Sequence, residues 1–273
     1  METLTASWPL VAALAAAGLT AGLAAGLFGI GGGAVIVPVL YLLLTGMGYP
    51  ETAMHVAVST SLATIIITSV RSVLAHHRRG AVDWAIVRGW APWIAGGSLL
   101  GMLVAGAVPG RGLTAFFGVM AFVLAAQLYF GRPTWRLSDD MPTGAIRAGT
   151  GGLVGMLSAL MGIGGGTFGV SLMTVCGRTI HQAVATAAGF GVAIGLPAAL
   201  AAIHTGWDVD ARPPATLGYI NVPAFLLISL FTVTMAPIGA ALAHRLDATL
   251  LKRLFAIVLA IAASRMLYSA WTG

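Results

Sequence analysis

The stretch "GLFGIGGGAVIVP" at residues 26–38 places four glycines in five positions within an otherwise apolar region. Each glycine costs a helix about 1 kcal/mol relative to alanine, so an uninterrupted membrane helix would not contain this run. A second copy, "ALMGIGGGTFGVS", occupies residues 159–171. The repeated run predicts two equivalent glycine turns at which helices are interrupted.

Composition places the chain in the membrane. The 273 residues are 58% hydrophobic and 8% charged, whereas a soluble domain carries about 25% charged residues. Apolar runs at 9–28, 56–75, 84–108 and 222–243 match the ~20 residues that a helix needs to cross hydrocarbon. We therefore predict an all-α, polytopic integral membrane protein that contacts lipid. The single cysteine excludes an internal disulfide and a cysteine-based metal cluster, and no cofactor or metal site is predicted.

The two glycine runs belong to a longer internal repeat. "GLAAGLFGIGGG" at 22–33 matches "GMLSALMGIGGG" at 155–166, and "MHVAVST" at 54–60 matches "IHQAVAT" at 180–186. We divide the chain into a first transmembrane repeat (1–131), a linker (132–144) and a second transmembrane repeat (145–273). Each repeat is expected to contain five helical segments, about ten in all: 9–29, 34–44, 53–75, 84–107, 112–130, 145–161, 167–176, 180–204, 219–243 and 249–270.

Basic residues predict the orientation. If the loop "HHRRG" at 76–80 is cytoplasmic, ten of the fourteen Lys and Arg residues lie inside and two lie outside. This topogenic bias accounts for the net charge of +6, so we expect no nucleic-acid partner. Both termini then lie outside, and an odd number of segments per repeat inverts the second repeat relative to the first. The segments at 34–44 and 167–176 are short, which favours re-entrant half-helices, although the charge count fits full crossings equally.

The depth of the glycine turns in the membrane, estimated from the helical rise, indicates a function for the glycines. At 1.5 Å per residue, the first turn and the hydroxyls of "STS" at 59–61 reach the membrane midplane from one side, and Gly166 and Thr186 reach it from the other. Two helix N-termini then converge with free N–H groups, an arrangement that binds anions. All eight acidic residues fall in loops, at the N-terminus or at helix ends, which favours an anion over a cation. The predicted substrate-binding residues are Gly31, Gly32, Gly33, Ala34, Ser59, Thr60, Ser61, Gly164, Gly165, Gly166, Thr167 and Thr186.

Three further residues are candidates for gating or proton coupling. His55 and His181 occupy equivalent repeat positions and titrate near neutral pH, but histidines that cap helix starts would look the same. Arg71 lies within a predicted helix, where it either counters a substrate charge or snorkels to the interface.

At these residues the sequence resembles the TauE/SafE family of sulfite exporters, also called the toluene-sulfonate uptake permease family. The resemblance rests on the doubled "GIGGG", on "VP" after the first copy, on "AVST" and "AVAT", and on "HRRGAVDW". It implies a bacterial inner-membrane transporter with periplasmic termini, whose cargo is a small inorganic or organic sulfur oxyanion such as sulfite, thiosulfate or a sulfonate, with proton coupling in some members. The second copy departs from the pattern, because Ser171 replaces the proline found at Pro38 and few hydroxyls follow Thr186. The two half-sites are therefore not expected to bind identically.

Our leading hypothesis is a secondary transporter that works by alternating access, with direction and coupling ion open. The alternative is an intramembrane hydrolase with Ser59 or Ser61 as nucleophile and His55 as base, since His55 and Ser59 share a helix face. That alternative lacks an orienting acid in the membrane, and the second copy has alanines at both serine positions. Small-residue spacings such as Gly97 with Gly101 fit a homodimer as well as packing within one chain.

Overall fold

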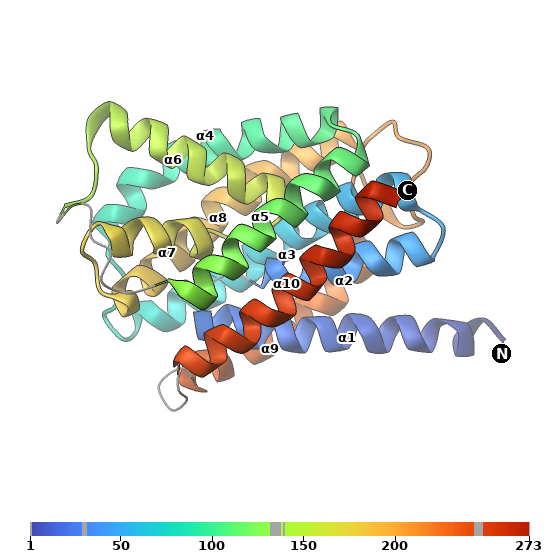
Figure 1. Cartoon of the computed structure of the whole chain (residues 1–273), viewed down its shortest axis with the longest axis horizontal. Helices are drawn as coiled ribbons and strands as arrows, with labels where there is room; N and C mark the ends of the chain where they lie inside the picture. The colour runs from blue at the N-terminus through green and yellow to red at the C-terminus, as the bar shows by residue number, and fades with distance from the viewer. Residues whose placement is uncertain (1, 29–31, 132–137, 139, 243–247, 273) are drawn as a thin grey trace.

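The protein is a bundle of helices. The computed structural model describes residues 2–28, 32–131, 138, 140–242 and 248–272. Within these ranges the chain forms ten helices and one short antiparallel hairpin (Figure 1). The elements are α1 (Glu2–Phe28), α2 (Gly33–Gly46), α3 (Pro50–His77), α4 (Trp84–Ala107), α5 (Gly110–Phe130), α6 (Gly144–Met161), α7 (Gly166–Val175), α8 (Ile180–Thr205), β1 (Thr216–Leu217), β2 (Ile220–Asn221), α9 (Val222–Leu242) and α10 (Ala248–Thr272).

Seven of these helices are long and apolar enough to cross a membrane: α1, α3, α4, α5, α8, α9 and α10. The predicted all-α, polytopic membrane fold is confirmed. By contrast, α2 has 14 residues and α7 has 10, so each is about 21 Å or 15 Å long at 1.5 Å per residue. Neither reaches the ~30 Å of the hydrocarbon core.

Both chain termini lie at one end of the bundle (Figure 1). We call this end the terminal end and the other the opposite end. From the middle of the molecule, α2 runs toward the terminal end and α7 toward the opposite end. The two short helices therefore begin inside the bundle and leave it in opposite directions.

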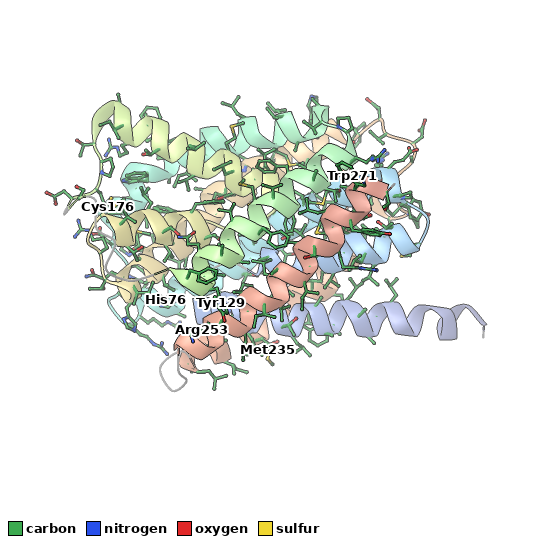
Figure 2. All side chains as sticks on the ribbon, in the orientation of Figure 1. His76, Tyr129, Cys176, Met235, Arg253 and Trp271 are labelled. Carbon is green, nitrogen blue, oxygen red and sulfur yellow. The ribbon has the colours of Figure 1, made fainter. Side chains whose placement is uncertain are left out.

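The centre of the bundle is formed by α3 and α8, which pack against each other. Around them, α9 packs on α3 and α4 packs on α8, while α1 pairs with α9 and α6 with α4. In the sequence repeat, α1 to α5 correspond to α6 to α10 in order. When each helix is replaced by its repeat equivalent, the contact of α3 with α9 becomes that of α8 with α4, and the contact of α1 with α9 becomes that of α6 with α4. The fifth helices, α5 and α10, pack on each other. Arg253 of α10 lies over the ring of Tyr129 in α5, 5.6 Å from its centroid, and Trp271 lies toward the other end of α10 (Figure 2).

The small-residue spacings serve contacts within the chain. A Cβ at Gly97 would lie 1.9 Å from the Gly152 carbonyl oxygen of α6, and one at Gly101 would lie 2.6 Å from the Met156 carbonyl oxygen. A Cβ on Gly195 of α8 would lie 2.8 Å from the Leu62 carbonyl oxygen of α3. Glycine is needed here because the backbones of neighbouring helices touch.

The start of α9 differs from the prediction. The sequence places a helix from about residue 219, whereas Thr216–Leu217 and Ile220–Asn221 form a hairpin and α9 begins at Val222. Two local features cause this. Gly218 adopts φ +56°, and the Asn221 side chain caps α9 by accepting a hydrogen bond from Ala224 N at 3.0 Å. The apolar run "LGYINV" hides this turn from hydropathy.

Two neighbouring glycines in α4 provide a test of the helix packing. Gly97→Ala should lower stability by about 1–3 kcal/mol, because its Cβ has no room against α6. Gly96→Ala is the matched control, since a Cβ there has nothing within 4 Å. Thermal unfolding in detergent measures both, and equal melting temperatures would contradict the packing.

Candidate functional site

The two glycine turns meet inside the bundle. The first turn is described from Gly32 onward and leads into α2; the second spans residues 162–166 between α6 and α7. A Cβ on Gly33 would lie 2.1 Å from the Gly162 carbonyl oxygen and 2.9 Å from the Ile163 Cα. Gly32 and Gly162 have φ values of +77° and +65°, which favour glycine. Backbone therefore touches backbone, and only glycine allows this approach.

A serine of α3 ties the second turn in place. The Ser61 hydroxyl donates a 2.7 Å hydrogen bond to the Gly162 carbonyl oxygen. A Cβ on Gly162 would lie 3.0 Å from the Val58 Cα, so α3 passes directly beside this turn. The structure thus brings together Gly33 and Ser61 from the first half of the chain with Gly162 from the second.

The helices that start at these turns have no side-chain cap. Gly32 and Gly165 precede α2 and α7, and neither has a side chain that could accept from the first helical N–H groups. The Gly32 carbonyl oxygen accepts from Val35 N and Ile36 N within α2. In contrast, Asp83, Thr179 and Asn221 cap α4, α8 and α9 with their side chains. The first residues of α2 and α7 are also buried: Gly33, Ala34, Gly166 and Thr167. Two positive helix ends without side-chain caps therefore lie inside the protein.

Three buried hydroxyls near the turns have no partner among the described residues: Ser59 Oγ, Ser158 Oγ and Thr167 Oγ1. Ser59 and Ser158 are 0% exposed and Thr167 is 4% exposed. A buried hydroxyl without a partner costs about 1–3 kcal/mol. Ser59 flanks the part of α3 that touches Gly162, Ser158 lies one helical turn before Gly162, and Thr167 is the second residue of α7. These groups are available to a ligand.

Ser158 was missed in the sequence analysis. Its signal is its spacing, since it stands four residues before the second "GIGGG" and so one turn from it. The first copy has Ala25 at the equivalent position, which is why the repeat comparison did not select it.

Besides Ser61, two further predicted hydroxyls have backbone partners. Thr60 Oγ1 accepts a hydrogen bond from Asn221 N, and Thr186 Oγ1 accepts one from Asp83 N, each at 3.0 Å. Gly164 and Gly165 are buried in the second turn, where a Cβ on Gly165 would lie 2.5 Å from the Phe190 Cβ of α8. Gly31 lies outside the described residues.

The gating candidates lie elsewhere. His55 belongs to α3 and is buried against the C-terminal end of α4. Its Nε2 lies 3.1 Å from the Ala105 oxygen and 3.0 Å from the Val108 oxygen. Because both oxygens are acceptors, Nε2 carries the proton and donates to them. The ring stacks on Tyr219 at 4.9 Å between centroids. Burial raises the pKa of the Tyr219 phenol, with Arg212 opposing, so this side chain is neutral at physiological pH.

Neither of the other two candidates is buried. His181 is exposed in the first turn of α8, unlike its repeat equivalent His55. Arg71 is exposed on α3, a position that fits snorkelling to the interface. His55 does not cap a helix start, as the alternative interpretation expected, because its Nε2 donates to carbonyl oxygens at the C-terminal end of α4.

Charge at the site comes from the backbone. The acidic side chains that the structure describes lie at helix starts or in loops: Glu51, Asp83, Asp140, Asp208 and Asp210. Within the described ranges, no group of three or more His, Cys, Asp or Glu residues could hold a metal ion. The two helix starts place the positive ends of their dipoles at the turns.

Comparison with known proteins identifies the family. The model of the sulfite exporter TauE/SafE family matches residues 14–266. The chain belongs to this family. It is 36% identical over 254 residues to a probable membrane transporter protein of Haemophilus influenzae, covering 91% of this chain and 95% of the relative. Probable membrane transporter proteins of Xylella fastidiosa and Methanocaldococcus jannaschii are 26% and 25% identical, covering 96% and 89% of this chain and 96% and 90% of the relatives. No solved structure matches the chain.

This TauE/SafE protein is therefore a membrane transporter and not an enzyme, which sets aside the hydrolase alternative. The contacts agree, because the Ser61 hydroxyl is bound to Gly162 and the Nε2 proton of His55 is bound to the end of α4.

Two serines of α3 test the assignment of hydroxyls. Ser61→Ala should lower stability by about 1–3 kcal/mol, because the Gly162 carbonyl loses its buried donor. Ser59→Ala should leave the melting temperature unchanged or raise it, since its hydroxyl has no partner to lose. Thermal unfolding of both variants in detergent, without added anion, makes the comparison. An equal loss in both would show that Ser59 has a structural partner.

Proposed function

We propose that this protein is a secondary transporter for small sulfur oxyanions such as sulfite, thiosulfate or a sulfonate. The anion binds between the two glycine turns, near the membrane midplane, and the site is exposed alternately to each side. The repeats at 1–131 and 145–273 are inverted relative to each other, with both termini on the periplasmic side of the inner membrane. The two short helices are then re-entrant half-helices of opposite direction.

The observation that carries this proposal is the pairing of two uncapped, buried helix starts with three partnerless hydroxyls. A sulfur oxyanion presents only hydrogen-bond acceptors, and backbone N–H groups and hydroxyls are donors that match them. Helix dipoles add positive potential without a fixed charge, so binding stays weak enough for release. The proposed ligands are the backbone N–H groups of the two turns together with Ser59, Ser158 and Thr167, whose hydroxyls have no partner among the described residues.

The proposal that the anion contains sulfur rests on the family. The matching family is described as sulfite exporters, and the site is suited to oxyanions in general. A comparison of sulfite, thiosulfate, sulfate and a sulfonate in one flux assay separates the cargo from the other anions.

Removing single hydroxyls tests the site. Ser59→Ala, Ser158→Ala and Thr167→Val should each raise the KM for the anion about tenfold or more, because a hydrogen bond to a charged group contributes about 1.5–3 kcal/mol. Thr114→Val is the matched control, since this buried threonine donates to Gly110 O within its own helix. Uptake of radiolabelled thiosulfate or sulfite into proteoliposomes gives the KM values. An unchanged KM in all three variants would show that the anion does not bind at the turns.

Membrane voltage tests the direction of transport. A potential of 100 mV, negative inside, favours exit of each negative charge by about 2.3 kcal/mol. Export alone is therefore expected to accelerate when a potassium diffusion potential is imposed on loaded proteoliposomes. If flux instead ignores voltage and follows an imposed pH gradient, the anion moves together with protons.

A further inference from the structure

The same hydrogen bond occurs twice, once in each direction between the halves of the chain. Thr60 Oγ1 accepts from Asn221 N at 3.0 Å, and Thr186 Oγ1 accepts from Asp83 N at 3.0 Å. The threonines end the repeated motifs "AVST" and "AVAT". Asp83 and Asn221 are also repeat equivalents, since each is the residue before the fourth helix of its repeat, α4 or α9. Both threonines are buried, at 0% and 1% exposed.

Each donor belongs to a rigid helix start. The Asp83 carboxylate accepts from Ala85 N and Ile86 N at 3.0 and 3.1 Å, and the Asn221 side chain accepts from Ala224 N at 3.0 Å. The N–H that each residue donates to a threonine is therefore fixed to the axis of α4 or α9. Sliding of α3 against α9 would break one bond, and sliding of α8 against α4 would break the other.

The two bonds lie under loops at opposite ends of the bundle. The loop that leads to β1, β2 and α9 lies at the terminal end, and the loop between α3 and α4 lies at the opposite end (Figure 1). Each interface carries a second polar contact between helices of different halves: Thr68 with Thr232 at 3.2 Å between α3 and α9, and Ser98 with the Ile194 oxygen at 2.6 Å between α4 and α8.

Both threonine helices touch the second glycine turn. On α3, Ser61 follows Thr60 directly and donates to the Gly162 oxygen. On α8, Phe190 lies one turn after Thr186 and packs so closely on Gly165 that a Cβ there would lie 2.5 Å from the Phe190 Cβ. A ligand that shifts this turn therefore acts on both helices.

We propose that Thr60 and Thr186 are positioning residues that form two gate bonds, one for each side of the membrane. The bond from Asn221 to Thr60 closes the terminal end, and the bond from Asp83 to Thr186 closes the opposite end. This inference rests on the alternating-access transport proposed above. With both bonds formed, the structure is the state closed at both ends. Transport then opens one bond at a time, while the partnerless hydroxyls hold the anion.

The first test measures access in the absence of any sulfur anion. Cys176, the only cysteine of the sequence, is replaced by alanine, and Ser158→Cys serves as the reporter beside the second turn. A charged, membrane-impermeant methanethiosulfonate is applied to spheroplasts and to inverted vesicles, and a C-terminal protease site identifies the face with the termini. Thr60→Val should raise the labelling rate from that face about fivefold, and Thr186→Val should raise it from the other face, as expected for one lost hydrogen bond.

Two controls make this result specific. Thr64→Val removes a buried hydroxyl one turn from Thr60 that donates only within α3, and Thr114→Val does the same in α5. Neither should alter the labelling from either face. General loosening of the fold would raise labelling from both faces in both gate variants, and that outcome, or no change in either variant, would overturn the proposal.

The second test closes the gates covalently. In the Cys176→Ala reporter background, Thr60→Cys is combined with Asn221→Cys, and Thr186→Cys with Asp83→Cys. Oxidation should stop labelling from the face of the cross-linked gate and leave the other face reactive, and reduction should restore it. Labelling through a cross-linked gate at the reduced rate would overturn the proposal. Directional labelling combined with no sulfur-anion flux in the protein that retains Ser158 would instead refute only the proposed cargo.

Discussion

The contact between Gly33 and the Gly162 carbonyl sets the geometry of the protein. A carbonyl oxygen that would lie 2.1 Å from a Cβ leaves no room for any side chain, so the two interrupted segments join backbone to backbone. This contact fixes where α2 and α7 begin, and it fixes their opposite directions. Everything polar in the centre is then arranged around two helix starts that are held together without charged side chains.

Such an arrangement is costly in an apolar bundle, and the packing offsets the cost. Uncapped N–H groups and buried hydroxyls each lose hydrogen bonds that water would supply. The surrounding helices contribute close backbone contacts, such as α4 on α6 at Gly97 and α8 on α3 at Gly195, where small residues allow extensive van der Waals contact. The buried hydroxyls without a partner among the described residues persist because close packing of the surrounding helices offsets their cost.

Much of this was predictable from the sequence because the signals are local and occur twice. Helix lengths follow from apolar runs, and the doubled "GIGGG" marks the turns. The contact of Gly33 with Gly162 could not be predicted from the sequence, since neither glycine run indicates which backbone atoms of the two turns are in contact. The contacts of Thr60 and His55 could not be predicted for the same reason: their partners, Asn221 N and the end of α4, are distant in sequence and are backbone groups, which carry no residue-type signal. The hairpin before α9 was hidden because its residues are as apolar as those of the helix that follows.

The distribution of hydroxyls between the two copies separates binding from gating. Thr60 and Thr186 occur in both repeats, as expected for two gates that face opposite sides of one membrane. The partnerless hydroxyls occur in only one copy each: Ser59 corresponds to Ala185, Ser158 to Ala25 and Thr167 to Ala34. A pair of identical half-sites would offer two equal places for an anion, whereas complementary half-sites offer one. The first repeat contributes its hydroxyl from α3 and the second contributes hydroxyls from α6 and α7. In the proposed transport cycle, an anion that accepts from all three contacts both halves of the chain, so its binding would depend on the relative position of the two repeats.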